Sequence, residues 1–196
     1  MARCWRLEPS GCSGWNSLAL ILRYGSLAGL IVVAPMLWNF WLGLGPGDKP
    51  QHSLLFGYLT MIVALTAVFL GVKHYRDKWL GGSVRFLPAL GVGLGISAVA
   101  STFYVIGWEV CMAYSSFDFV AFYKAFMIES AQAKSGTPAE LQQAIADAES
   151  FAKNYVNPLY RMPFTFIEIF PVGVLISLIS ALVLRNSRVL PARDAT

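Results

Sequence analysis

Charged residues and cysteines are both scarce in this chain of 196 residues. Only 13% of the residues are charged, whereas 56% are hydrophobic, and the mean hydropathy is +0.56. A soluble domain carries about 25% charged residues, so this deficit argues against a disordered chain and against a soluble nucleic-acid-binding protein. The three cysteines are an odd number without metal-ligand spacing, which argues against a disulfide framework. The composition therefore predicts a membrane protein.

The sequence contains four long apolar segments. A helix needs about 20 mainly apolar residues to cross the hydrocarbon layer of a bilayer, and each segment is long enough. The first apolar segment is too long for the core of a cleaved signal peptide, so we expect it to be retained. The sequence predicts an all-α integral membrane protein with four transmembrane helices, at about residues 22–45, 54–73, 86–109 and 162–185. These lie in a transmembrane domain at 18–188, between an N-terminal arm at 1–17 and a tail at 189–196.

The distribution of lysine and arginine predicts the orientation of these spans. Ten of the fifteen basic residues fall on one side of an even-numbered bundle, which by the positive-inside rule is the cytoplasmic side. Both termini are therefore expected in the cytoplasm. The loop after the second span is expected to enforce this topology and to contact anionic lipid, or to bind a cytoplasmic partner. We call it the basic loop; its basic residues are Lys73, Arg76, Lys78 and Arg85.

The segment at 114–161 between the third and fourth spans is far longer than the other connections. Aromatic residues recur at helical spacing from Phe119 to Met127, and Thr137-Pro138-Ala139-Glu140 has the pattern of a helix-capping box. The segment is predicted to form an amphipathic helical hairpin outside the cytoplasm. It either lies on the membrane surface, or packs over the mouth of the bundle, or docks a partner protein. It has no basic stripe for nucleic acid.

Small residues recur at four-residue spacing in three of the spans. Gly25 with Gly29, Gly91 with Gly95, and Gly173 with Ser177 form such stripes. Stripes of this kind let helices approach closely, either within one tight bundle or between copies in a homo-oligomer. Helix kinks are predicted at Pro35 and in the segment that contains Pro171 and Gly173.

No motif for catalysis, metal binding or cofactor binding is present, and the two histidines fall on opposite sides of the bundle. The most informative residue is Glu168, an ionisable group about 9 Å inside the fourth span. Counting residues from the span ends predicts a polar layer at that depth. The layer either satisfies its own hydrogen bonds or forms a site for an ion, a proton or a small molecule. Its members are Asn39, Thr60, Thr102 and Glu168.

Several segments together resemble a known family. The first span carries Arg23-Tyr24-Gly25, the second ends in Tyr75-Arg76-Asp77, and the fourth contains Glu168-Ile169-Phe170-Pro171-Val172-Gly173. The chain is similar over about residues 18–188 to the membrane proteins grouped as domain of unknown function 4199. The resemblance implies a four-helix protein of the bacterial inner membrane. It supplies no catalytic residue.

The expected function is interaction or assembly without enzymatic activity. The expected partners are the lipid bilayer and either further copies of the chain or another membrane protein, with no nucleic acid and no cofactor. The alternative is a subunit of a small oligomeric transporter or channel that uses Glu168 in the polar layer of the outer leaflet.

Overall fold

The described part of the chain folds into helices and short connections. The computed structural model describes residues 12–41, 50–114, 118–134 and 136–191. No strand occurs within these ranges, so the predicted all-α class is confirmed. The helices are α1 (Cys12–Trp41), α2 (Pro50–Trp79), α3 (Phe86–Tyr114), α4 (Phe119–Lys134), α5 (Pro138–Tyr155) and α6 (Pro158–Leu184).

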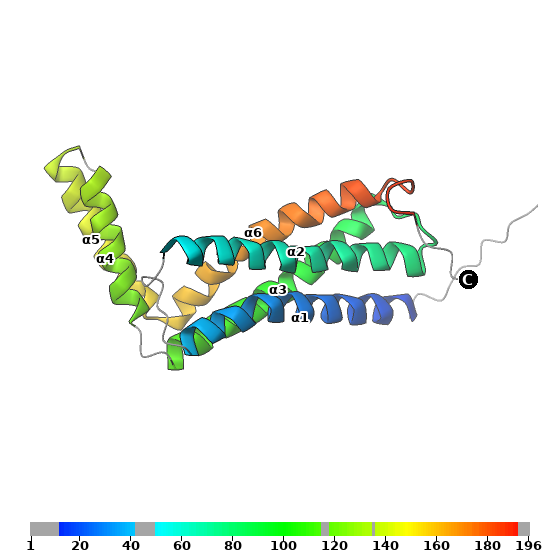
Figure 1. The fold of residues 1–196 in the computed structure, drawn as a ribbon, viewed down its shortest axis with the longest axis horizontal. Helices are drawn as coiled ribbons and strands as arrows, with labels where there is room; N and C mark the ends of the chain where they lie inside the picture. The colour runs from blue at the N-terminus through cyan, green and yellow to red at the C-terminus, as the bar shows by residue number, and fades with distance from the viewer. Residues whose placement is uncertain (1–11, 42–49, 115–117, 135, 192–196) are drawn as a thin grey trace, which may run out of the picture.

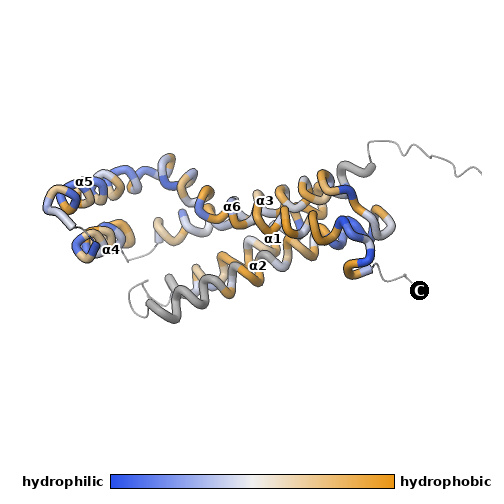
Figure 2. The backbone as a smooth tube through the Cα atoms, turned by 90° about the horizontal axis from the view of Figure 1, so that it is seen from above, coloured by the Kyte–Doolittle hydropathy of each residue, from blue (hydrophilic) through white to orange (hydrophobic). Residues whose placement is uncertain are grey.

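The helices form two groups (Figure 1). The long helices α1, α2, α3 and α6 lie lengthwise beside one another as a bundle, whereas α4 and α5 lie beside each other and run crosswise at one end of it. The opposite end holds the start of α1, the connection between α2 and α3, and the end of α6. We call these the α4–α5 end and the termini end. Hydrophobic residues follow the bundle, and hydrophilic residues gather at its two ends (Figure 2).

Three of the long helices are apolar enough to cross a membrane. Within the described residues these are Asn16–Trp38, Phe86–Tyr114 and Pro158–Leu184. Their outward side chains include Leu87, Ile106 and Leu182, each more than half exposed, as a helix surrounded by lipid requires. The chain is therefore a membrane protein that crosses the bilayer more than once. The 30-residue helix α2 packs beside these three.

Small residues make the closest contacts between the long helices. A Cβ atom added to Gly25 of α1 would lie 2.6 Å from the Cβ of Val99 in α3. On the other side of α3, Gly93 packs on Ser177, and Gly173 packs on Ser97 at 2.6 Å from its Cβ. The first and third predicted stripes are thus used inside one chain. The second is used in part, because Gly91 has open space beside it, whereas a Cβ on Gly95 would lie 3.0 Å from the side chain of Ile21 in α1.

The main apolar core lies toward the termini end. All four long helices contribute to it, and Val72, Ile96 and Leu184 are fully buried there. Helix α1 continues through Pro35, and α6 continues through Pro163 and Pro171. The predicted kinks at Pro35, Pro171 and Gly173 stay predictions.

The capping box at the start of α5 is confirmed. The backbone N–H of Glu140 donates to Thr137 Oγ1 at 3.3 Å, and the carboxylate of Glu140 accepts from the backbone N–H of Thr137 at 3.1 Å. The aromatic rings of Tyr123 in α4 and Phe151 in α5 pack at a centroid distance of 5.4 Å. Phe126, on the same helix as Tyr123, is 54% exposed.

Candidate functional site

The four residues of the predicted polar layer have different surroundings. Thr102 is exposed on α3 and donates its hydroxyl to the Ala98 carbonyl of its own helix at 2.9 Å. Glu168 is exposed on α6, and Thr60 is half-buried on α2. The side chain of Asn39 lies outside the described residues. The own-helix bond accounts for the Thr102 hydroxyl without a shared layer, and the layer itself stays a prediction.

An ion pair joins α3 to α6 at the α4–α5 end. Arg161, in the first turn of α6, donates from Nε to Glu109 Oε1 at 2.8 Å and from Nη2 to Glu109 Oε2 at 2.5 Å. Its remaining terminal nitrogen donates to the backbone carbonyl of Tyr155 at 3.2 Å. The side chains of Arg161 and Glu109 are only 8% and 18% exposed. A two-pronged charged contact of this kind fixes position and angle as well as distance, so α3, α6 and the end of α5 are held together.

Aromatic residues surround this ion pair. The guanidinium of Arg161 lies 5.8 Å from the ring centroid of Tyr155, within the range of a cation–π contact. The indole N–H of Trp108 donates to the Tyr155 hydroxyl at 3.1 Å. The ring of Phe119, at the start of α4, meets Trp108 edge-on at 4.8 Å. Tyr155 therefore connects α3, α4 and α6 to α5, and we call Trp108, Glu109, Phe119, Tyr155 and Arg161 the junction cluster.

Burial raises the pKa of the Tyr155 phenol, although the hydrogen bond from the Trp108 indole acts in the opposite direction. The phenol therefore stays neutral at physiological pH and keeps its lone pairs available to the Trp108 indole. All charged groups of the junction cluster have partners. The arrangement is suited to fixing helices in place, because its contacts join α3, α4, α5 and α6.

The sequence contained a signal for the ion pair that was not used. Glu109 follows the uncharged core of the third span, and Arg161 precedes that of the fourth, so the two opposite charges stand at the same level of neighbouring antiparallel helices. Pairing the charges at matching span ends would have predicted the contact.

A second arginine organises the termini end. Arg76 is fully buried, donates from Nε to Asp77 at 2.6 Å, and donates from its terminal nitrogens to the backbone carbonyls of Val189, at 2.9 Å, and Leu190. Lys73 also donates to Asp77. Burial raises the pKa of Asp77, but the hydrogen bonds from Arg76 and Lys73 outweigh this and hold the pKa below its usual value. Arg76 therefore fastens the segment after α6 to the end of α2.

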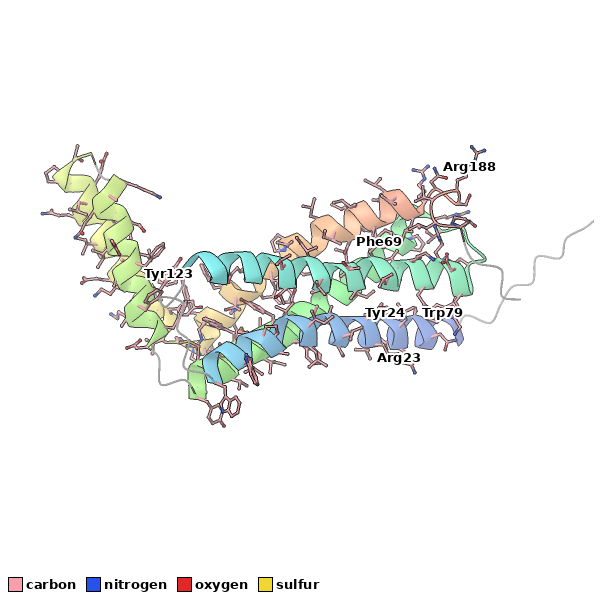
Figure 3. All side chains as sticks on the ribbon, in the orientation of Figure 1. Arg23, Tyr24, Phe69, Trp79, Tyr123 and Arg188 are labelled. Atoms are coloured by element: carbon pink, nitrogen blue, oxygen red, sulfur yellow. The ribbon has the colours of Figure 1, made fainter. Side chains whose placement is uncertain are left out.

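The basic loop is helical for most of its length. Lys73, Arg76 and Lys78 lie in the last turns of α2, and Arg85 directly precedes α3. Lys78 and Arg85 are exposed, whereas Arg76 is turned inward. Arg23 and Arg188 lie toward the same end of the bundle and point away from it, while Tyr123 lies at the opposite end (Figure 3). The basic residues in the described ranges on α1, α2 and the tail thus gather at the termini end.

The centre of the bundle holds a cavity of about 30 Å³. This volume fits about one or two water molecules. The two serine hydroxyls on its wall are engaged, since Ser97 pairs with Ser177 at 3.2 Å and Ser101 donates to the Ser97 carbonyl. The cavity is too small for a solute. Its lining consists of Ala28, Val32, Ala64, Val68, Ser97, Ala100, Ser101, Ile169, Val172 and Gly173.

Helices α2 to α6, most of α1 and the junction cluster fall within one matched region of the chain. Residues 23–186 match the family model described as a protein of unknown function, DUF4199. The chain therefore belongs to this family, as the residues quoted above for the resemblance predicted. No curated protein and no solved structure matches the chain.

Proposed function

We propose that the protein is a four-span component of the bacterial inner membrane that acts by binding another membrane or envelope protein through α4 and α5, without enzymatic activity. In this proposal α2 is the fourth span. Since α1, α2, α3 and α6 alternate in direction between the two ends of the bundle (Figure 1), a membrane around them leaves the termini end on one side and α4–α5 on the other. The basic residues at the termini end favour the cytoplasm for that side.

The junction cluster is the observation that carries the interaction role. Arg161, Glu109 and Tyr155 fix the end of α5 to the bundle, so the pair of helices is held at a defined position. The pair also presents a mixed surface. Phe126 is 54% exposed on α4, and most of α5 beyond its contact face is polar and exposed. A helical pair that is fixed in position and exposes an apolar side chain such as Phe126 among polar ones is typical of helix-mediated recognition.

The topology is tested by labelling single cysteines in intact cells. In the full chain with Cys4, Cys12 and Cys111 replaced, we expect Ala139→Cys to react with a membrane-impermeant maleimide. The matched variant Ser83→Cys, exposed in the connection between α2 and α3, should react only after permeabilisation. Labelling of Ser83→Cys from outside would overturn the proposed orientation.

The binding role is tested by photo-crosslinking in native membranes. A crosslinking amino acid at position 126 should give an adduct of one reproducible mass. The same group at Ile62, exposed on α2, should give only lipid adducts. A result in which both positions give lipid adducts alone would contradict the binding role and favour a helical pair that rests on the membrane surface.

A further inference from the structure

Three arginine side chains at the termini end have no anionic partner within the described part of the chain. Arg85 directly precedes α3, while Arg185 and Arg188 follow α6, and all three are exposed. None of the ion pairs among the described residues includes them. Asp77, the carboxylate that the structure describes at this end, is already bound by two basic residues of α2. The positive charge of the three guanidinium groups is therefore left for a partner outside the chain.

The fold brings these arginines to one place. The start of α3 lies beside the end of α6 (Figure 1). Val84 and Leu184, which directly precede the first two arginines, are buried in the same core cluster. The third, Arg188, belongs to the segment after α6, which Arg76 holds through the two backbone carbonyls that follow it. We call the three residues the arginine patch: Arg85, Arg185 and Arg188.

The arginine patch lies at the level where two candidate spans end. One span begins at Phe86 and another ends at Leu184, each one residue away from an arginine of the patch. Leu87 and Leu182 lie within one turn of these arginines on the membrane side and are 74% and 61% exposed. An anion bound at the patch would thus have an apolar surface next to it, which suits a lipid that carries a phosphate group above its acyl chains. A free phosphate ion would make no use of this apolar surface.

Guanidinium groups are suited to this ligand. A planar guanidinium can donate two parallel hydrogen bonds to a phosphate group, which an ammonium group cannot do. The bonds from Arg76 also fix the backbone from which Arg188 projects, so less entropy is lost when a ligand binds. A role in topology alone requires only positive charge on that side of the membrane, and it does not require a fixed tail.

We propose that the arginine patch binds the phosphate group of an anionic phospholipid in the leaflet at the termini end. The inference rests on the membrane placement proposed above, and it goes beyond the binding of another protein by α4 and α5. It also separates the patch from the basic loop as a whole, because Lys73 and Arg76 of that loop are engaged with Asp77, whereas the patch residues remain available.

The test measures lipid binding to the full-length protein in mild detergent by native mass spectrometry. Phosphatidylglycerol and phosphatidylcholine with the same acyl chains are the two probes. A basic residue near an anionic surface changes binding about five-fold, so the loss of two such residues corresponds to about 25-fold. We expect the natural protein to prefer phosphatidylglycerol. The double variant Arg185→Gln with Arg188→Gln should lower the affinity for phosphatidylglycerol by this factor and leave the affinity for phosphatidylcholine unchanged.

Lys134→Gln with Lys153→Gln is the matched control. It also removes two exposed positive charges that make no ion pair with the described residues, but it removes them from α4 and α5, so the affinity for phosphatidylglycerol should not change. Equal affinities of the natural protein for the two lipids, or an equal loss in the control variant, would overturn the proposal. Displacement of phosphatidylglycerol by an equal concentration of inorganic phosphate would also overturn it, because the site would then take the free anion.

Photo-crosslinking covers the case in which the double arginine variant fails to fold. A crosslinking amino acid replaces Ser187, which is exposed between two arginines of the patch, and the vesicles contain equal amounts of the two lipids. Its adducts should be mainly with phosphatidylglycerol, whereas adducts from Ile62, exposed on α2, should contain the two lipids equally. Equal adducts at position 187 would overturn the proposal. Failure of the membrane placement would be recognised separately, because alkaline carbonate would then release the protein from membranes before any lipid binding is measured.

Discussion

Glu109→Ala removes both oxygen atoms that accept from the guanidinium of Arg161. The positive charge then stays in a position that is only 8% exposed, with the Tyr155 carbonyl as its remaining acceptor. Breaking a buried ion pair in this way costs about 3–5 kcal/mol, mainly because the surviving charge is left without compensation. Since Glu109 is itself 18% exposed, water reaches the site in part. We therefore expect the lower end of the range, about 3 kcal/mol.

Two further variants give this prediction its controls. Lys124→Ala removes an ion pair with Glu149 whose side chains are 36% and 61% exposed, and it should cost less than about 1 kcal/mol. The double variant Glu109→Leu with Arg161→Met replaces both charges by apolar groups, which for buried pairs is often close to neutral. The double variant should therefore be more stable than Glu109→Ala.

Two measurements test this prediction. The first is the free energy of unfolding of the full chain in mild detergent, and the second is hydrogen exchange in the segment that joins α5 to α6. Exchange there should rise in Glu109→Ala and stay unchanged in Lys124→Ala. The reasoning would be refuted if Glu109→Ala cost no more than Lys124→Ala, or if the double variant were as unstable as the single one.

Three other changes test contacts elsewhere in the bundle. Gly173→Leu should destabilise the protein by about 1–3 kcal/mol in the same unfolding assay, because its Cβ would lie 2.6 Å from that of Ser97. Tyr155→Phe removes the hydroxyl that accepts from the Trp108 indole and should cost about 1 kcal/mol, measured as a shift in the unfolding midpoint. The pKa of Asp77 is lower in the folded state than in the unfolded state. The Asp77 carboxylate therefore stabilises the folded state at neutral pH. This contribution to the free energy of unfolding is lost below about pH 3.9, as the pH falls through the pKa of the folded state. The protection of the tail amides, corrected for the intrinsic pH dependence of hydrogen exchange, should therefore fall at acid pH in the natural protein, and should be low already at neutral pH in Asp77→Asn.

The elements of the fold could be predicted because each depends on local sequence. Long runs without charge imposed long helices, and the third predicted span begins at Phe86 as α3 does. The capping box at Thr137 was readable because its two hydrogen bonds join residues three positions apart. Helix ends were less predictable. The basic residues after Val72 were interpreted as a loop, whereas α2 continues to Trp79, since charged residues are good helix formers outside the hydrocarbon layer.

The junction cluster was harder to predict because its contacts depend on the register between helices. Glu109 and Arg161 are 52 residues apart, and no periodicity within either helix reports how the two align. The polar layer was predicted from depth alone, and depth does not give the direction in which a side chain points. Thr102 and Glu168 were predicted at one level but are exposed on different helices, and the Thr102 hydroxyl is satisfied by the backbone of its own turn.

The two arginines act by the same physical principle at opposite ends of α6. Arg161 binds the carbonyl of Tyr155, just before α6, and Arg76 binds the carbonyls of Val189 and Leu190, just after it. Segments that flank a membrane helix have backbone groups without helical partners, and the planar guanidinium can satisfy several acceptors at once. Both flanks of α6 are thereby fixed to neighbouring helices, and its inner face is fixed to α3. Phe164 adds a further contact, because its ring packs on Phe151 and Tyr155 of α5. A helix that is fixed at both ends and along its inner face holds one orientation relative to the bundle, so its exposed side chains keep defined positions.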